Sequence, residues 1–269
     1  MHKKSSQQKT QGINMHSIFI SGAAQGIGAA TAALFAKHGY RVGIYDLNIE
    51  KAQTLATQLG ENVRAGQLDV TDYKSWQHAL EDFTTWAGQL NILVNNAGIL
   101  YSGPFENTAI VDHHRTTQVN VNGVLNGCHA AFPYLKQAKF ARVINLSSAS
   151  AIYGQADLIS YSASKFAVRG ITEGLDVEWQ KHGIRVLDVM PFFVQTDMVK
   201  DMNAGSIKNM GVNLNPEDVA ATIFKSVKIK DSIFTATHQP VGLKSKFFFG
   251  LSRLSPQFIN RISNIFIAK

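Results

Sequence analysis

One predicted helix holds a pair of side chains that could move a proton. Tyr161 and Lys165 are four residues apart in the segment 161–182, whose apolar spacing predicts a helix, so both lie on one helix face. A free phenol has a pKa of about 10, which is too high for efficient acid/base chemistry near neutrality. A neighbouring ammonium favours the phenolate and lowers that pKa. The pair therefore indicates a tyrosine acid/base, and a surface pair at helical spacing is the competing interpretation.

A serine comes before this helix, where a strand is expected to end. Ser148 follows the predicted strand 142–146, and parallel doubly wound sheets bind ligands beyond the carboxyl ends of their strands. Its hydroxyl could therefore hold a substrate oxygen near the acid/base. A helix cap is the alternative, and on physical grounds Ser147 is an equal candidate.

A glycine-rich turn near the N-terminus could bind a phosphate group. It follows the predicted strand 18–21 and leads into the predicted helix 27–38, whose first N–H groups and dipole favour an anion. The glycine spacing is G-x-x-x-G-x-G rather than G-x-G-x-x-G, and tight helix–strand packing is the alternative use of such glycines. The candidate pyrophosphate-binding residues are Gly22, Gln25, Gly26, Ile27 and Gly28.

An acidic residue closes the second predicted strand, 41–46. Asp46 could accept hydrogen bonds from the adenosine ribose hydroxyls, and it would repel a 2′-phosphate. Leu47 follows it, and the glycine turn contains no Arg or Lys. These features favour NAD as the cofactor over NADP, whereas the alternative is that Asp46 only caps the next helix.

Strands and helices are predicted to alternate along most of the chain. The strand segments are short, β-branched and without polar alternation, which is typical of a parallel sheet covered on both faces. We therefore predict an α/β fold, a Rossmann-like doubly wound parallel sheet of about seven strands in a single domain. Strands are expected at 18–21, 41–46, 63–68, 92–94, 142–146, 184–189 and 232–235. Helices are expected at 27–38, 49–59, 72–86, 111–135, 161–182 and 216–227.

Composition and charge narrow the class of protein. Hydrophobic residues make up 45% of the 269 residues and charged residues 17%, which suits a packed core. Of the net charge of +7, residues 1–14 hold +3 and residues 232–269 hold +5, so the body is near neutral. A near-neutral body argues against nucleic-acid binding. We expect a disordered polar tail at 1–14, a catalytic dinucleotide-binding domain at 15–241, and an amphipathic basic extension at 242–269.

Other residue types add few chemical possibilities. Cys128 is the single cysteine, so it cannot form an internal disulfide; it is predicted to be a core residue, and a cytoplasmic location is favoured. His113 and His114 have no partners in a metal-ligand pattern, so no metal site is expected. No stretch approaches the ~20 apolar residues of a membrane-spanning helix.

Taken together, the motifs resemble those of classical short-chain dehydrogenases/reductases. The resemblance covers about residues 17–236 and rests on the glycine turn, Asp69-Val70, Asn95-Asn96-Ala97-Gly98, Asn120, Ser148 and Tyr161-Ser162-Ala163-Ser164-Lys165. It selects Ser148 over Ser147, and it implies that Asn120 completes a catalytic tetrad through a water linked to Lys165. It implies reversible hydride transfer between an alcohol carbon and nicotinamide, with Tyr161 taking or giving the hydroxyl proton.

The resemblance also implies the remaining cofactor contacts. Lys165 would bind the nicotinamide ribose, Asp69 and Val70 the adenine, and Asn96, Ala97 and Gly98 would line the cofactor cleft. Val194 and Thr196, after Pro191, match positions that hold the carboxamide. Phe192 departs from the family, which usually has glycine there. We expect an altered loop geometry at Phe192 and an added apolar wall.

The sequence thus favours an NAD(H)-dependent oxidoreductase of a small-molecule alcohol or ketone. An apolar substrate is expected because the segment 197–214, the variable substrate loop in the family, contains methionines and aliphatic residues; loop packing explains them equally well. A non-catalytic dinucleotide sensor and an NADP-dependent carbonyl or ketoacyl reductase are the alternatives. The resemblance implies a homodimer or homotetramer. A basic amphipathic helix is expected from residue 256 onward, docked on the protein, on a partner or on a membrane surface.

Overall fold

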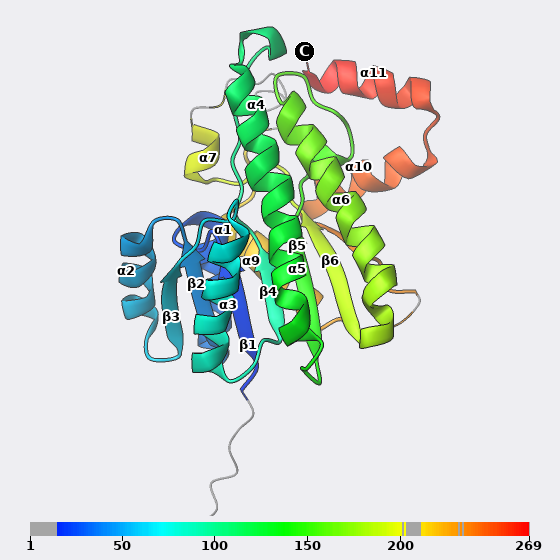
Figure 1. Ribbon diagram of the computed structural model, residues 1–269. Helices are drawn as coiled ribbons and strands as arrows, with labels where there is room; N and C mark the ends of the chain where they lie inside the picture. The colour runs from blue at the N-terminus through cyan, green and yellow to red at the C-terminus, as the bar shows by residue number, and fades with distance from the viewer. Residues whose placement is uncertain (1–14, 201, 203–210, 231, 233, 269) are drawn as a thin grey trace, which may run out of the picture.

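The computed structural model describes residues 15–200, 202, 211–230, 232 and 234–268. The predicted tail at 1–14 and part of the expected substrate loop lie outside the described residues. In the described part, seven parallel strands form one sheet in the order β3-β2-β1-β4-β5-β6-β7 (Figure 1). Their bounds are β1 (Ser17–Ser21), β2 (Arg41–Asp46), β3 (Val63–Gln67), β4 (Ile92–Asn95), β5 (Ala141–Leu146), β6 (Ile184–Met190) and β7 (His238–Pro240). The predicted fold class is confirmed.

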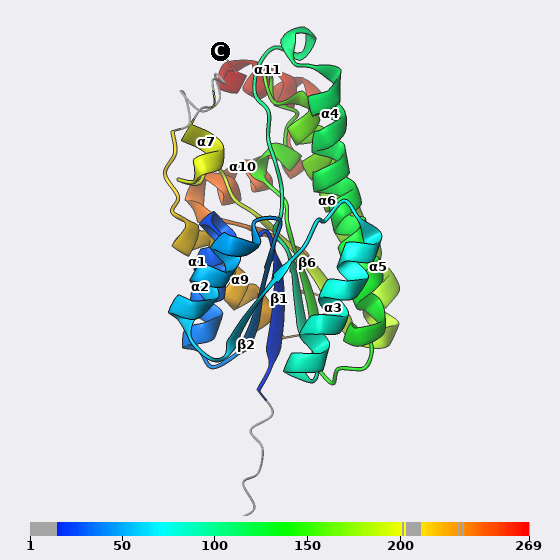
Figure 2. The same ribbon diagram turned by 60° about the vertical axis from the view of Figure 1, so that its left-hand side comes forward.

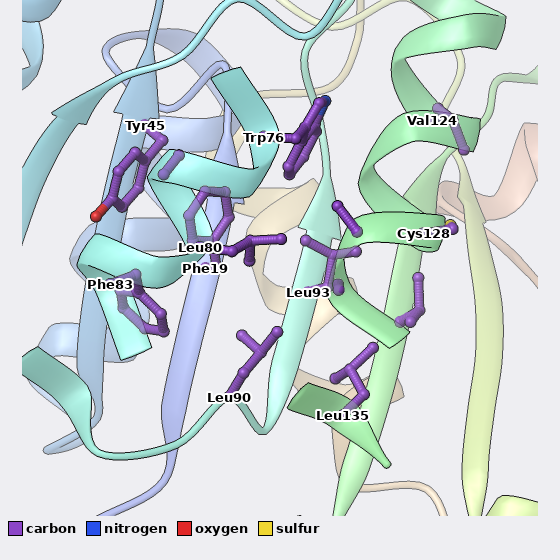
Figure 3. Close-up of a cluster of buried hydrophobic side chains, with 14 of the residues drawn as sticks. Phe19, Tyr45, Trp76, Leu80, Phe83, Leu90, Leu93, Val124, Cys128 and Leu135 are labelled. Atoms are coloured by element: carbon purple, nitrogen blue, oxygen red, sulfur yellow. The ribbon is translucent and has the colours of Figure 1, made fainter. Parts of the chain in front are cut away.

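Helices cover both faces of the sheet, because alternate residues of each strand point to opposite sides. In β1, Ile18 and Ile20 pack with Phe35 and other residues of α1 (Gly26–Lys37), α2 (Ile49–Leu59) and α9 (Pro216–Val227). Phe19 points the other way, toward α3 (Tyr73–Ala87), α5 (Gly123–Leu135) and α6 (Ile159–Trp179). Figure 2 shows these two helical layers from the side, and Figure 3 shows Phe19 in its aromatic and aliphatic cluster. The central strands β1, β4 and β5 are buried at every residue, whereas the edge strand β3 is only partly buried.

One predicted strand is wrong, and one predicted helix is interrupted. Residues 232–235 were expected as a strand, but the seventh strand is His238–Pro240, and the N–H of Thr235 closes a turn on the carbonyl of Ser232 at 3.0 Å. Phe234 is 89% exposed, so its side chain does not enter the core. The long helix at 111–135 is α4 (Ile110–Thr117) and α5 joined by a π turn at Gln118–Asn122.

The C-terminal extension forms two helices rather than one. They are α10 (Gly242–Leu254) and α11 (Gln257–Ala268), and Ser255 lies between them. The inner side of α10 docks on the sheet: the buried Ser245 hydroxyl donates to the carbonyl of Met190 at 2.8 Å, and Phe248 and Phe249 pack around Met190. The helix expected from residue 256 onward is α11, whereas α10, which packs on the protein, was not predicted. Among the described residues, no helix combines the length and apolar character needed to cross a bilayer.

Candidate active site

A cleft of about 1280 Å³ opens at the carboxyl edge of the sheet. It brings together predicted residues from the carboxyl ends of six strands, β1 to β6, and from α6. Those that line it are Gly22, Gln25, Gly26, Ile27, Asp46, Leu47, Asp69, Val70, Asn96, Ala97, Gly98, Ser148, Tyr161, Lys165, Pro191, Val194 and Thr196. The other two predicted site residues, Gly28 and Asn120, lie behind the wall of the cleft rather than on it. The predicted set thus forms one site.

The glycine turn is shaped by close backbone contacts. Gly22 has φ of +63°, and a Cβ there would lie 2.7 Å from Cα of Ala97. A Cβ on Gly28 would lie 2.5 Å from the carbonyl oxygen of Gly22. The amide of Asn96 donates to that same carbonyl at 2.7 Å and so fixes the turn. Only glycine fits at these two positions, which keeps the turn narrow.

The first turn of α1 faces the cleft as an anion site. Gln25 is its N-cap, no side chain caps the helix, and its first turn contains no acidic residue. Unsatisfied N–H groups and the positive end of the helix dipole favour a negatively charged group there. The turn and helix therefore fit the pyrophosphate of a dinucleotide.

Asp46 is anchored beside this turn. Its carboxylate accepts hydrogen bonds from the N–H of Ala24 and the N–H of Asn48, both at 3.0 Å. The cap of α2 is instead Asn48, which accepts from the N–H of Lys51 at 3.0 Å. The alternative interpretation, in which Asp46 caps that helix, is therefore wrong.

A cation that the sequence did not indicate lines the same cleft as Asp46. Nζ of Lys51 donates to Oε1 of Gln25 at 3.1 Å, and both side chains line the cleft. Lys51 lies outside the glycine turn and four residues after Leu47, so neither of those segments indicates it. The signal that could have found Lys51 was its place in the first turn of the next helix, which points to the same edge of the sheet.

The proposed acid/base and its neighbours meet at the other end of the cleft. The Ser148 side chain lies close enough to Tyr161 for a hydrogen bond that lowers the pKa of the phenol. Nζ of Lys165 lies 5.5 Å from the centroid of the Tyr161 ring and donates to the carbonyl of Leu146 at 2.6 Å. Ser147 turns away, toward the carbonyl of Lys165 at 3.3 Å. The geometry therefore pairs Tyr161 with Ser148 and not with Ser147.

Burial sets the proton affinities of this pair. It raises the pKa of Tyr161 above the ordinary phenol value, and the hydrogen bond from Ser148 only partly offsets that rise. Burial also lowers the pKa of Lys165 to about 8. The expected lowering of the tyrosine pKa is thus not present in the protein alone, because desolvation outweighs the neighbouring groups. A positively charged group bound in the cleft would act in the opposite direction.

Asn120 sits at the π turn between α4 and α5. Its amide donates to the carbonyl of Ile99 at 2.9 Å and to Oγ of Ser164 at 3.1 Å, and its Oδ1 accepts from the N–H of Ile99 at 2.8 Å. The Asn120 side chain thereby connects the loop after β4 to α6. π turns are frequent at functional sites because they redirect a helix locally. Here the turn places Asn120 next to Gly98. A Cβ on Gly98 would lie 3.3 Å from Oδ1 of Asn120 and 3.8 Å from Nζ of Lys165, so the three residues are close neighbours.

The predicted core cysteine is confirmed. Cys128 is buried, its sulfur takes a hydrogen bond from the amide of Asn95 at 3.3 Å, and burial raises its pKa to about 12. It is therefore a neutral thiol. His113 binds Oγ of Ser160 at 2.5 Å, and the described residues include no group of three or more His, Cys, Asp or Glu arranged to hold a metal.

Comparison with known proteins identifies the family. A model of the short chain dehydrogenases matches residues 16–206. The chain is also 36% identical over 179 residues to a 3-alpha-(or 20-beta)-hydroxysteroid dehydrogenase of Mycobacterium tuberculosis, covering 66% of this chain and 69% of that one. The chain belongs to the short-chain dehydrogenase family. It is therefore a nicotinamide-dependent oxidoreductase that acts on CH–OH groups.

Two solved structures share the fold of this short-chain dehydrogenase. A 3-ketoacyl-(acyl-carrier-protein) reductase from Brucella melitensis, complexed with NADH, matches with a TM-score of 0.79 and 27% identity, over 84% of this chain and 96% of that one. ElxO with NADP bound matches with a TM-score of 0.76 and 27% identity, over 84% and 97%. The two differ in cofactor, so family membership leaves the choice between NAD and NADP open.

Phe192 departs from the usual family glycine without strain. Among described non-glycine residues only Asp157 has a positive φ, so the backbone at Phe192 is one that any residue tolerates. The Phe192 side chain is therefore accommodated without a left-handed backbone. Its ring lines the cleft and lies 6.4 Å from the ring of Phe193 and 5.8 Å from that of Phe248 on α10.

An apolar wall follows from that position. Phe192 and Phe193 pack with Leu100, Leu158 and Tyr161, so the acid/base borders a hydrophobic surface. Sequence reasoning named only Phe192 here. Phe193 and Leu158 were missed because their side-chain direction depends on loops whose path the sequence pattern does not show.

Proposed function

We propose that this short-chain dehydrogenase transfers hydride between an apolar alcohol or ketone and NAD(H), with Tyr161 as acid/base. The observation that supports it most is the single cleft in which the Tyr161–Ser148 hydroxyl pair shares a wall with the glycine turn. A non-catalytic sensor would need the turn but not this hydroxyl pair beside a buried lysine.

The residues divide the chemistry between them. Bound nicotinamide supplies the hydride donor or acceptor. In oxidation, Tyr161 takes the hydroxyl proton of the substrate, and in reduction it returns a proton to the developing alkoxide. Ser148 holds the substrate oxygen through its hydroxyl. Lys165 binds the ribose hydroxyls and supports the phenolate by its charge, while Asn120 and Gly98 position the lysine.

Recognition of the dinucleotide is proposed along the rest of the cleft. Gly22, Gln25, Gly26, Ile27 and Gly28 would hold the pyrophosphate, Asp46 and Leu47 the adenosine ribose, and Asp69 and Val70 the adenine. Asn96 and Ala97 would line the middle, and Pro191, Val194 and Thr196 the carboxamide. The close fit of Gly22 and Gly28 supports these roles, since a side chain at either position would clash with the backbone of Ala97 or Gly22 and distort the turn.

The substrate is proposed to be apolar, either a ring or a long-chain compound. Phe192, Phe193, Leu100 and Leu158 support this, because they border the acid/base without adding a charge. We test the function by calorimetric titration with NAD(H) and NADP(H), followed by turnover on a panel of alcohols and ketones. Cyclic and long-chain compounds should exceed short polar ones in kcat/KM. Failure of both NAD(H) and NADP(H) to bind would refute the proposal.

NADP is the second candidate for the cofactor, and the contact between Lys51 and Gln25 favours it. Lys51 beside Gln25 could pair with a 2′-phosphate, which supports an NADP-dependent carbonyl reductase. We favour NAD because the anchored carboxylate of Asp46 would repel that phosphate.

Replacing Asp46 by asparagine tests this choice. Asp46→Asn keeps an acceptor for the N–H of Ala24 and removes the charge, so the kcat/KM ratio of NADP to NAD should rise by about tenfold or more. Adding Lys51→Ala should reverse that gain, because the phosphate then loses its cation. Steady-state kinetics with both cofactors measure the ratio, and an unchanged ratio in Asp46→Asn would contradict the assignment.

We also propose that the protein is a homo-oligomer in the cytoplasm. Leu125, Phe166 and Val177 are exposed apolar side chains on α5 and α6, and they support a homodimer or homotetramer formed through these two long helices. The lone cysteine supports a cytoplasmic location. A peripheral membrane contact through residues 244–269 is also proposed, on the features of α10 and α11.

A further inference from the structure

The C-terminal helix pair, α10 and α11, has an apolar outer side. The inner side of α10 is packed on the protein, but six large hydrophobic side chains of the pair remain exposed, from 37% for Ile259 to 86% for Leu243. On α11 the exposed positions recur at helical spacing and form one stripe. The exposed side chains are Leu243, Phe247, Phe258, Ile259, Ile262 and Ile265.

All charged residues in the C-terminal segment that contains these helices are basic. Residues 232–269 contain five Lys and Arg and no Asp or Glu. Lys246 on α10 and Arg261 on α11 are exposed among the apolar side chains. A basic and apolar helix face is typical of helices that lie in the interface of an anionic lipid bilayer.

A second copy of the chain fits this face less well. An isologous dimer would set the +5 segment against its own copy, and like charges across an interface repel. The rest of the chain between the two basic ends sums to −1, so its net charge gives the +5 segment little attraction. Charge complementarity therefore selects anionic lipid as the occupant.

The helix pair lies at the end of the molecule where the cleft opens. Both views show α11 at the same end as α7 (Asp197–Lys200), which follows the carboxyl end of β6 (Figures 1 and 2). The amide of Asn264 on α11 donates to the carbonyl of Gly154 at 2.5 Å, and the N–H of Gly103 donates to the carbonyl of Asp157 in the same loop at 2.9 Å. Two apolar side chains of the cleft lining are themselves exposed at this end: Val111 is 64% exposed and Met198 is 42% exposed.

We propose that the outer side of α10 and α11 binds an anionic membrane surface and turns the mouth of the cleft toward the bilayer. Phe248 links this surface to the substrate wall through its contact with Phe192. Entry of an apolar substrate from the lipid rests on the function proposed above, whereas lipid binding itself does not.

The test is co-sedimentation of the full chain with vesicles of phosphatidylcholine alone or mixed with phosphatidylglycerol. Two variants change the outer side: Phe258→Asp with Ile262→Asp, and Lys246→Glu with Arg261→Glu. The matched control is Phe234→Asp, an 89% exposed phenylalanine in the loop before β7, at the opposite edge of the sheet. Point variants are preferred to truncation at residue 242, because loss of α10 would uncover Met190.

We expect the wild type and Phe234→Asp to bind the mixed vesicles. Their affinity for vesicles of phosphatidylcholine alone should be lower by at least about tenfold. Both outer-side variants should bind the mixed vesicles at least about tenfold more weakly than the wild type. Equal binding by all four proteins, or no binding of the wild type, would overturn the proposal. So would a wild-type dimer in sedimentation velocity that the outer-side variants dissolve, since a second copy would then be the occupant. Turnover of a water-soluble ketone without vesicles should be equal in all four proteins, so loss of lipid binding and loss of enzyme function are read separately.

Discussion

Replacing Tyr161 by phenylalanine is expected to lower kcat by about 10²–10⁴-fold. The change removes only the hydroxyl that is hydrogen-bonded to Ser148, and the ring that packs beside Leu158 and Phe193 remains. Without that hydroxyl no group is positioned to exchange the substrate proton, whereas the glycine turn and Asp46 are untouched. Dissociation constants for NAD and NADH should therefore stay within about twofold of the wild type.

The chain offers a matched control for this measurement. Tyr153 is also a buried tyrosine, close to Ser150, but its hydroxyl has no hydrogen-bond partner among the described residues, and it does not line the cleft. Tyr153→Phe should leave kcat unchanged. If Tyr161→Phe kept a tenth or more of the wild-type kcat, the acid/base would have to be another group.

The sequence could reveal the parts of the site that depend on local spacing. The pairing of Tyr161 with Lys165 follows from one helical turn, and the glycine turn follows from its place between a strand and a helix. Both lie where they were predicted, because such relations need no knowledge of distant contacts. The choice between Ser147 and Ser148 was not of this kind: it came from family resemblance, and the structure supports it through the path of the loop after β5.

Other features depend on contacts between distant segments. The π turn at Asn120 leaves the apolar pattern of 111–135 almost unchanged, so periodicity predicts one continuous helix there. The strand at His238–Pro240 has little β propensity, and it forms because Asp188, Val189 and Met190 of β6 provide its partners. The sequence pattern instead favoured a strand at 232–235, although the Phe234 side chain is 89% exposed.

A buried polar row crosses the sheet, and the sequence pattern did not predict it. Asn95, Asn145, Asp188 and His238 are register neighbours on β4, β5, β6 and β7. All four are buried, and the amide of Asn95 donates to Oδ1 of Asn145 at 2.8 Å. Each residue stands alone in its own strand, so the row becomes visible only when the order and register of the strands are known.

Asp188 and His238 form the charged end of this row. Nδ1 of His238 lies 2.9 Å from Oδ2 of Asp188, and its Nε2 lies 2.7 Å from Oε1 of Glu173 on α6. The ring of Phe249 on α10 contacts His238 at 5.6 Å between centroids. The pair thus joins β6, β7 and α6 at the point where α10 docks.

Replacing Asp188 by alanine is expected to lower the free energy of unfolding by about 3–5 kcal/mol at neutral pH, because it removes one partner of a buried charged pair. Urea denaturation followed by circular dichroism measures the loss. Asp188→Asn, which keeps the shape and a hydrogen-bond acceptor, should cost less than alanine. A loss below about 1 kcal/mol for alanine would show that His238 finds a new partner.

The size of this loss should depend on pH in a definite direction. Burial lowers the pKa of His238, but hydrogen bonds and the charges of Asp188 and Glu173 outweigh burial and raise it. Burial raises the pKa of Asp188 despite its contact with His238. A group whose pKa is raised by folding contributes stability at low pH and loses it as pH rises through the folded value, and this holds for both members of the pair. The destabilisation by Asp188→Ala should therefore be larger at about pH 6 than at about pH 9. A difference that grew with pH would instead mean that the neutral histidine, rather than the ion pair, holds β7 in place.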